Sequence, residues 1–317
     1  MSNHDAEIID GKLDSSILRS IECLKNDQLI GLPTETVYGL AALASSKTAV
    51  RKIFKVKQRP TSHPLILHLA SFEELDKWAI EIPKYAKDLG KHFWPGPLTI
   101  ILQRSNLVCD EITGGRNTVA IRVPNHSVAL RLLSNLNDGL VAPSANRFGK
   151  VSPTSAHHVV ADLGSDIALV LDGGHCAVGI ESTILDCTRT NLQILRVGAI
   201  TKNEIKEIAK LNVDESDGEA RASGMLEKHY APNCKVVVAE NSAQAIARQI
   251  ELENAGVRAS VLDFCDNINL YAKQLYAELR LADANDIAVV VAVLPAGDGL
   301  AEAIRDRLTK AAASNQS

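Results

Sequence analysis

Two short segments about ninety residues apart carry the side chains best suited to binding phosphate. Lys57 and Arg59 are two positions apart, just before a proline, in a nine-residue run that holds five basic residues. Ser144 and Asn146 have the same spacing just after a proline. Cations neutralise phosphate charge, and hydroxyl and amide groups bind single oxygens. Together the four residues suit a triphosphate, although each segment alone also fits a solvated helix face or an ordinary turn.

Three further segments offer polar groups to a ligand. Thr34, Thr36 and Tyr38 alternate, so an extended segment would place all three on one face, either lining a pocket or facing outward from a half-buried strand. Arg122 lies in an apolar, strand-like run and needs an anion if it is buried, either a carboxylate of the protein or one of a substrate. Residues 172–183 contain three glycines, which permit close approach of the backbone to a ligand.

The motifs of several enzyme classes are missing from the sequence. It contains neither G-x-x-x-x-G-K-[ST] nor G-x-G-x-x-G, which excludes a P-loop and a dinucleotide fingerprint. No histidines or cysteines have the spacing of metal ligands, and no serine or cysteine has the context of a nucleophile. We therefore expect no tightly bound metal, and we expect catalysis by positioning and electrostatics rather than through a covalent intermediate.

Composition favours a small anionic ligand over bulk nucleic acid. The chain has 317 residues, enough for about two domains, and a net charge of −4. Residues 1–211 carry 24 basic and 22 acidic residues, whereas residues 212–317 carry 10 and 16. Only 4% of residues are aromatic, which argues against stacking of many bases. The first part is thus nearly neutral with local cations, as expected of a site for a small anion.

We expect a cytoplasmic protein without membrane contact. The six cysteines include no C-x-x-C pair and are interpreted as reduced thiols. The first residues are polar and acidic, unlike a signal peptide, and no apolar run reaches about 18 residues.

Apolar periodicity divides the chain into alternating helix-like and strand-like segments. Helices are expected at 15–25, 48–56, 126–136, 154–163, 201–210, 242–255, 268–282 and 300–312. Strands are expected at 29–32, 65–69, 98–102, 118–123, 139–142, 167–171, 182–185, 192–197, 236–239, 259–262 and 287–293. Asp14 and Thr154 are candidate N-caps, and Thr201 with Glu204 is a candidate capping box. The alternation predicts an α/β protein, whose three β-α units after residue 232 form a small, parallel, doubly wound domain.

The order and spacing of the motifs resemble the YrdC/Sua5 family, which makes threonylcarbamoyl-adenylate for tRNA modification. The resemblance rests on the two phosphate-suited segments, on Pro33-Thr-Glu-Thr-Val-Tyr-Gly39 and Trp94-Pro-Gly-Pro97, and on Ser223-Gly-Met-Leu-Glu-Lys-His-Tyr-Ala-Pro232. It implies a YrdC-type twisted mixed-sheet domain with a second, smaller Rossmann-like three-layer domain. The implied boundaries are 1–211 for the catalytic domain, 212–232 for a polar linker and 233–317 for the Sua5-type C-terminal domain.

The same resemblance implies roles for particular residues. Lys57 and Arg59 would be catalytic. The implied nucleotide contacts are Lys57, Arg59, His63, Thr118, Ser144, Asn146, Ser152, Arg196 and Tyr230. The implied threonine contacts are Thr36, His68, Arg122, Ala142 and Ser182. His63 stands where the family often has asparagine, which leaves the role of that position open.

The implied reaction joins L-threonine, bicarbonate and ATP, with Mg²⁺ accompanying the nucleotide, and releases pyrophosphate. The product would pass to a tRNA threonylcarbamoyl transferase complex, and the basic run leaves a weak RNA contact open. Two other functions remain as hypotheses. One is a carbamoyl transferase, because YrdC-like modules occur in larger hydrogenase-maturation proteins. The other is a non-catalytic RNA-binding module that uses the basic run.

Overall fold

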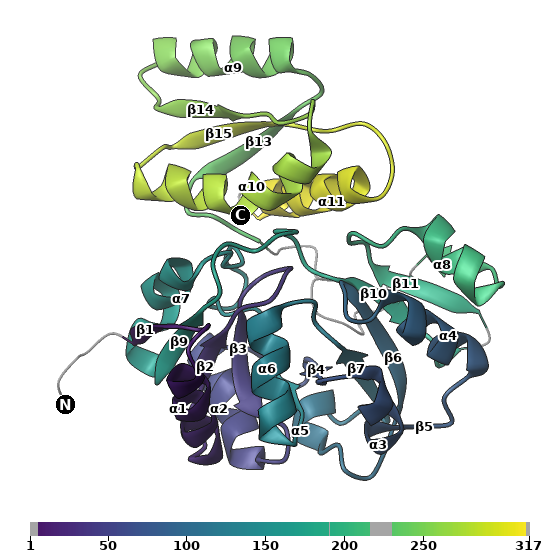
Figure 1. Cartoon of the computed structure of the whole chain (residues 1–317). Coiled ribbons are helices and arrows are strands. Elements are labelled where there is room, and N and C mark those ends of the chain that lie inside the picture. The colour runs from purple at the N-terminus through teal and green to yellow at the C-terminus, as the bar shows by residue number, and fades with distance from the viewer. Residues whose placement is uncertain (1–5, 190, 216–229, 315–317) are drawn as a thin grey trace.

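The computed structural model describes residues 6–189, 191–215 and 230–314, which form a large and a small α/β unit (Figure 1). The helices and strands of the large unit are β1 (Glu7–Asp10), α1 (Asp14–Lys25), β2 (Ile30–Leu32), β3 (Gly39–Leu43), α2 (Lys47–Lys57), β4 (Ile66–His68), η1 (Phe72–Glu74), α3 (Leu75–Trp78), β5 (Ala79–Ile80), α4 (Lys84–Phe93), β6 (Leu98–Arg104), α5 (Asp110–Thr113), β7 (Thr118–Arg122), α6 (Ser127–Leu136), β8 (Leu140–Val141), α7 (Ala156–Leu163), η2 (Gly164–Asp166), β9 (Leu169–Asp172), β10 (Thr183–Asp186), β11 (Leu192–Arg196), α8 (Lys202–Ala209) and β12 (Val213–Glu215). Those of the small unit are β13 (Lys235–Ala239), α9 (Ser242–Asn254), β14 (Ala259–Leu262), α10 (Ile268–Ala284), β15 (Val289–Val293) and α11 (Leu300–Ala313).

A 12-stranded mixed sheet organises the large unit. Its strand order is β1-β9-β2-β3-β8-β4-β7-β6-β10-β11-β12, and β5 pairs with β6. Pairs such as β4 with β7 are parallel, whereas β2 with β3 and β6 with β7 are antiparallel. The sheet therefore brings chain segments that are far apart in sequence to neighbouring strand ends.

Residues of β3 show how helices cover both faces of this sheet. Leu40 and Ala42 pack in the same cluster as Ile53 of α2, whereas Ala41 packs in the cluster that contains α1 and α6. This alternation is the two-residue period of a strand that is buried on both faces. Each large apolar side chain buried in this way contributes about 1.5–3 kcal/mol. Leu24, for example, is fully buried where α1 meets α6.

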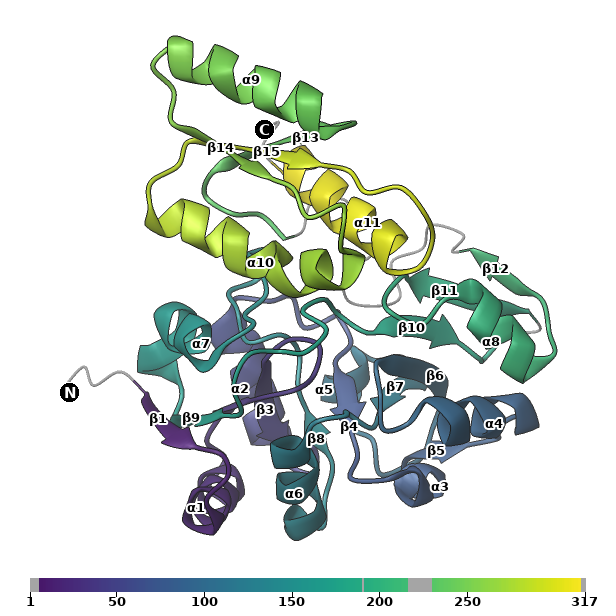
Figure 2. The ribbon, with the colours of Figure 1, turned by 45° about the horizontal axis from the view of Figure 1, so that its top comes forward.

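The small unit is a three-layer sandwich. Its strands run in the order β13-β15-β14 and are all parallel. Helix α9 covers one face, and α10 and α11 cover the other (Figure 1). In both views α10 and α11 also lie between the small sheet and the large unit (Figure 2). The predicted α/β class, with a mixed-sheet domain and a smaller Rossmann-like domain, is confirmed.

Several local expectations need correction. The N-cap position of α1 is Leu13, which makes no side-chain cap hydrogen bond, and Asp14 is the first residue of the helix. The N-cap of α7 is Ser155, whose hydroxyl accepts from the amide of His158, and not Thr154. The capping box of Thr201 and Glu204 is confirmed.

The segment expected to be a linker is in part a strand. Residues 213–215 form β12, which pairs with β11 in parallel register. The rest of the acidic stretch, 216–224, lies outside the described residues. The domain boundaries as a whole stay a prediction. None of the helices in the described ranges is both long and apolar enough to cross a membrane.

Candidate functional site

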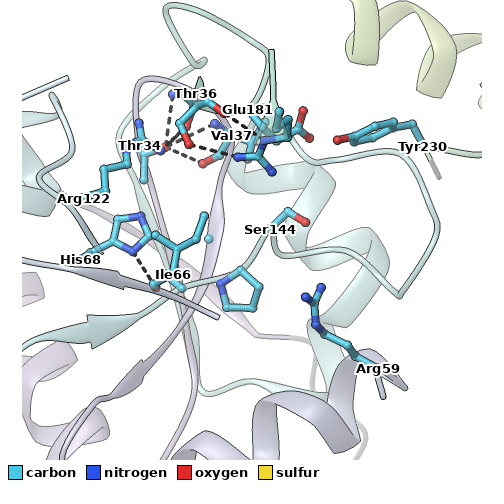
Figure 3. A pocket seen from close by; sticks show the side chains of 15 residues that line it. Thr34, Thr36, Val37, Arg59, Ile66, His68, Arg122, Ser144, Glu181 and Tyr230 are labelled. Carbon is cyan, nitrogen blue, oxygen red and sulfur yellow. Dashed lines mark hydrogen bonds between the residues drawn. The ribbon is translucent and has the colours of Figure 1, made fainter. Parts of the chain in front are cut away.

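A cavity of about 550 Å³, counting the part open to solvent, is lined by residues of the large unit and by Tyr230, which precedes the small unit (Figure 3). Nine of the predicted site residues line it, namely Thr36, Arg59, His68, Arg122, Ala142, Ser144, Ser182, Arg196 and Tyr230. They come from eight separate stretches of the chain between residues 36 and 230. In Figure 3, Arg122 and His68 lie on one side of the cavity, and Arg59 lies on the other.

Backbone hydrogen bonds hold the motif segments together at this place. The amide of Leu40 donates to Pro143 O at 2.7 Å, and the amide of Ala145 donates to Tyr38 O at 2.8 Å. Gly39 and Ser144 form an isolated antiparallel bridge. The segment before β3 and the loop after β8 therefore form one rigid wall, which explains why residues so distant in sequence share a cavity.

Arg122, at the end of β7, is held in one orientation by three protein groups. Its Nε donates to Gly96 O at 3.1 Å, and its Nη1 donates to Thr36 Oγ1 at 2.9 Å. Its Nη2 lies 2.7 Å from Glu35 Oε2, and both side chains are buried. Of the two anions that the sequence left open, the structure thus shows the protein carboxylate. Sequence reasoning missed Glu35, although an acid inside an apolar motif was a signal for a buried ion pair.

The segment from 34 to 38 bends, so the expectation that Thr34, Thr36 and Tyr38 share one face is wrong. Thr34 Oγ1 donates to Val37 O at 2.6 Å and accepts from the amide of Thr36 at 3.2 Å. Thr34 and Thr36 line the cavity together. The hydroxyl of Tyr38 instead donates to the carbonyl of Gly174 at 2.8 Å, on the other side of the segment.

His68 supplies a neutral imidazole to the cavity. The side chain is buried at the end of β4, and its Nδ1 lies 3.2 Å from Ile66 O. Burial and the nearby charge of Arg122 lower the pKa of His68 to about 3. At neutral pH the ring can therefore bind a ligand through a hydrogen bond but not as a cation.

Two buried guanidinium groups, Arg59 and Arg196, face the same cavity. Burial and the charge of Arg196 lower the pKa of Arg59 to about 10. Arg196 donates from Nε to Ser182 O at 2.9 Å and from Nη2 to Ser182 Oγ at 3.0 Å. Buried like charges that repel each other across a cavity mark a place prepared for an anion. Because Arg122 lies in the same cavity, one ligand with two separate anionic groups would fit the charge pattern.

Glu181 is a second residue that sequence reasoning missed. It belongs to the glycine-rich segment 172–183, lines the cavity and is buried. Its carboxylate accepts from Ser152 Oγ at 2.6 Å and from Tyr276 Oη at 2.9 Å, and Arg307 Nε lies 3.3 Å away. Burial alone would raise its pKa, but the charges of Arg307 and Arg196 and the Ser152 hydrogen bond outweigh it and lower the pKa to about 2.

Other predicted residues lie behind the cavity wall rather than on it. Lys57 is the last residue of α2, and its Nζ donates to Ser144 O and to Asn146 O, each at 2.5 Å. Asn146 Nδ2 donates to Arg147 O and Lys150 O at 2.8 Å. Lys57 and Asn146 thus brace the loop that presents Ser144, and Ser152 reaches the cavity only through Glu181.

The structure does not bring His63 and Thr118 to the cavity. The ring of His63 packs against Phe148, with 5.5 Å between their centroids. Thr118 begins β7 and pairs with Gln103, whereas Arg122 ends the same strand roughly 13 Å away at 3.3 Å per residue. Among the described residues, no group of three or more His, Cys, Asp or Glu side chains is arranged to hold a metal ion.

Comparison with protein families accounts for both units. Residues 22–198 match the Sua5/YciO/YrdC family model, described as "Telomere recombination". Residues 200–313 match the model described as "Threonylcarbamoyl-AMP synthase, C-terminal domain". The chain belongs to the Sua5/YrdC family. The predicted resemblance, including the long Sua5 type with its C-terminal domain, is confirmed.

Relatives match nearly the full length of this Sua5/YrdC chain. The threonylcarbamoyl-AMP synthase of Pyrococcus abyssi is 39% identical over 310 residues, covering 91% of each chain. The enzyme of the same name from Bacillus subtilis is 38% identical and covers 94% of this chain and 93% of its own. A crystal structure of P. abyssi Sua5 complexed with L-threonine is 36% identical, covers 98% of both chains and superposes with a TM-score of 0.90.

Proposed function

We propose that this chain is an L-threonylcarbamoyladenylate synthase, which forms threonylcarbamoyl-AMP and pyrophosphate from L-threonine, bicarbonate and ATP. The observation that carries the proposal is one cavity with Arg122 on one side and Arg59 on the other, and with Arg196 in its wall, where its charge lowers the pKa of Arg59. This pattern matches an amino acid carboxylate and a polyphosphate bound side by side. The full-length relatives named threonylcarbamoyl-AMP synthase support the same activity.

Threonine would bind at the Arg122 end of the cavity. Its carboxylate pairs with the guanidinium, while Thr36, Ser182 and neutral His68 offer hydrogen bonds to its amine and hydroxyl. The amine nitrogen adds to the carbon of carbon dioxide, one C=O bond opens, a proton leaves the nitrogen, and a carbamate results. With bicarbonate the same carbamate forms when the C–OH bond breaks and water leaves. A carbamate oxygen then attacks the α-phosphorus of ATP, and the bond to pyrophosphate breaks. The chemistry needs no covalent intermediate with the protein.

Charge that gathers on the phosphates is met at the other end of the cavity. Arg59 and Arg196 stabilise it directly, and Ser144 donates a hydroxyl from its braced loop. Lys57, predicted as catalytic, acts in this geometry as a positioning residue, because its ammonium group holds the loop from behind. Such a transfer of an adenylyl group would make the enzyme a nucleotidyltransferase.

Mg²⁺ would arrive with the nucleotide rather than in a site built by the protein. Mg²⁺ commonly uses one or two carboxylates plus substrate phosphates and waters as ligands. The carboxylate in the cavity wall, Glu181, is already engaged by Ser152, Tyr276 and Arg307. The ion would therefore bind the phosphates, and Arg59 and Arg196 would hold these phosphates in the cavity.

The product contains a reactive mixed anhydride, so a second enzyme must use it before water hydrolyses it. We infer a downstream transferase complex that moves the threonylcarbamoyl group to an adenosine of tRNA in the cytoplasm. The basic surface of α2 offers it, or the RNA itself, a weak electrostatic contact.

The proposal is tested with purified protein, L-threonine, bicarbonate, ATP and Mg²⁺. Pyrophosphate release should depend on threonine, and mass spectrometry should detect an acylated AMP. Pyrophosphate release without threonine would reject the substrate assignment. Turnover that requires carbamoyl phosphate would support the carbamoyl transferase, and tRNA binding without turnover would support the RNA-binding module.

Replacing Arg59 gives a sharper test of the phosphate site. Arg59→Ala should lower turnover about 100-fold or more, the usual effect of losing one group that stabilises transition-state charge. Arg51→Ala is the matched control, because Arg51 is an exposed arginine of α2, the helix that ends two residues before Arg59, and it pairs with Glu111. Equal activity of the two variants would remove Arg59 from the mechanism.

A further inference from the structure

Two polar side chains of the small unit reach across to the cavity wall. Tyr276 of α10 and Arg307 of α11 are both fully buried where these helices face the large unit (Figure 2). Both contact the same carboxylate oxygen, Glu181 Oε2, at 2.9 and 3.3 Å. The C-terminal unit thus contacts a residue that lines the cavity.

Arg307 also holds the backbone beside a second cavity residue. Its Nη1 donates to the carbonyl of Val197 at 2.7 Å, directly after Arg196. Arg196 in turn donates to the carbonyl and hydroxyl of Ser182, directly after Glu181. One guanidinium from the small unit therefore fixes the spacing between the two segments that carry Glu181 and Arg196.

The contacts of Glu181 also determine how closely its carboxylate can approach Arg196. Glu181 lies between two arginines, and Arg307 and the Tyr276 hydroxyl both bind the same oxygen of the carboxylate. While they do so, Glu181 cannot turn fully toward Arg196. Arg196 then keeps the orientation that its bonds to Ser182 give it, in the wall of the cavity.

Packing alone does not account for this cluster. Buried ion pairs are weak sources of stability compared with apolar residues of similar size, whereas they can fix one orientation. The rest of the same helices shows the apolar alternative, since Leu275, Leu279 and Leu308 belong to an apolar cluster that also contains Val37 and Ile180 of the large unit. A fully buried arginine and a tyrosine hydroxyl both contact the carboxylate of Glu181. Their contacts indicate that this carboxylate must be held in one orientation.

We propose that Tyr276 and Arg307 are positioning residues, through which the C-terminal unit orients Glu181 and Arg196 for the nucleotide. The inference rests on the proposed function, because it assigns the Arg196 end of the cavity to ATP. Neither residue touches the reacting atoms.

The test compares two tyrosines of the same helix in the full-length protein. Tyr276→Phe removes the hydrogen bond to Glu181 and keeps the ring that stacks on Tyr230. Tyr271→Phe is the control, because this side chain is also buried and its hydroxyl bonds to Leu262 O and Val293 O within the small unit. Calorimetry measures the affinity of each variant for α,β-methylene-ATP with Mg²⁺ and, separately, for L-threonine.

Tyr276→Phe should weaken binding of the ATP analogue about fivefold or more, as expected for losing a hydrogen bond to a charged group. Threonine binding should change by less than about twofold, because the Arg122 end keeps its partners. Tyr271→Phe should change neither affinity. Equal effects of the two variants, or an unchanged affinity in Tyr276→Phe, would overturn the positioning role.

Arg307→Lys and Arg307→Met provide a second comparison. Lysine keeps the positive charge beside Glu181 and should retain more analogue affinity than methionine. Equal affinities in these two variants would reduce Arg307 to a packing role. Failure of the proposed function would appear separately, as absence of acylated AMP with the wild-type protein.

Discussion

Arg122 carries its charge where water has little access, and Glu35 is its anionic protein partner among the described residues. The pair shows a general feature of this cavity, in which each buried cation is oriented before a ligand arrives. Gly96 and Thr36 occupy two edges of the guanidinium, so the ligand carboxylate must approach the remaining face. Orientation in advance reduces the entropy that substrate binding costs.

Changing Glu35 to glutamine should separate the stability of the free protein from its affinity for threonine. The substitution leaves Arg122 buried without an anion, which should lower the free energy of unfolding by about 3 kcal/mol. Threonine then restores an anion, so its stabilising effect on Tm should be larger in Glu35→Gln than in the wild type. Thermal unfolding with and without threonine measures both effects.

The control for Glu35→Gln is Glu251→Gln, which breaks an exposed ion pair with Arg248. Exposed pairs contribute little, so neither Tm nor the effect of threonine should change appreciably. Equally small changes in both variants would show that Glu35 does not compensate Arg122.

The depressed pKa of His68 predicts a loss of stability in mild acid. The unfolded imidazole takes up a proton near pH 6.5, whereas the folded one does so only near pH 3. Between these values the unfolded state binds more protons, so stability falls as the pH falls, by up to about 1.4 kcal/mol per pH unit. Urea unfolding at pH 7, 6 and 5 should show a steeper fall for the wild type than for His68→Gln. Parallel curves would contradict the buried neutral imidazole.

At the scale of single helices and strands, the predictions were best where the residues that determine the structure are neighbours in sequence. The capping box of α8 and the apolar face of α6 follow from residues within one or two turns, and both were predicted. The bend at 35–37 was not predicted, because the hydroxyl of Thr34 binds neighbouring backbone groups and competes with an extended strand. Alternation of polar residues cannot reveal that competition.

Gly179 is the element-scale feature that most directly limits how close the two units can pack. It has φ +85°, and a Cβ there would lie 2.5 Å from Ala272 O and from the Cα of Lys273 in α10. Gly179→Ala should therefore displace the helix and lower the free energy of unfolding by about 2–3 kcal/mol, from overpacking added to backbone strain. Gly256→Ala has a similar φ of +77° but no atom within 4 Å, so it isolates the strain. Urea unfolding of both variants gives the difference, and equal losses would show that α10 can yield.

At the scale of the whole molecule, the sequence indicated two units but not what joins them. The segments near residues 57 and 144 could be paired because cations and donors of one ligand site belong together chemically. Nothing comparable linked Glu181 to Arg307, which are separated by 126 positions. Their contact depends on the packing of α11 against the large unit, which local periodicity does not determine. The cavity was therefore predictable in outline, whereas the contacts that the small unit makes with its wall were not.

A second contact between the units is suited to measurement at this scale. Arg280 of α10 donates from Nη1 to Asp162 Oδ1 at 3.0 Å and from Nη2 to Asp162 Oδ2 at 2.6 Å, and it also bonds to the carbonyl of Val151. Both charged side chains are largely buried, at 15% and 19% exposure, so the pair is desolvated more than a surface pair. The two-pronged geometry favours a stronger interaction than a single contact.

A double-mutant cycle of Arg280→Met and Asp162→Asn should give a coupling free energy of about 1–2 kcal/mol in urea unfolding. Lys84 and Asp88 provide the comparison, because this pair is largely exposed within α4 and should couple by about 0.3–0.5 kcal/mol. The Arg280 coupling should also persist in 0.5 M salt, since screening acts weakly on buried pairs, whereas the Lys84 coupling should fade. If the two cycles gave the same small, salt-sensitive values, the ion pair of Arg280 and Asp162 would have no part in joining α10 to the large unit.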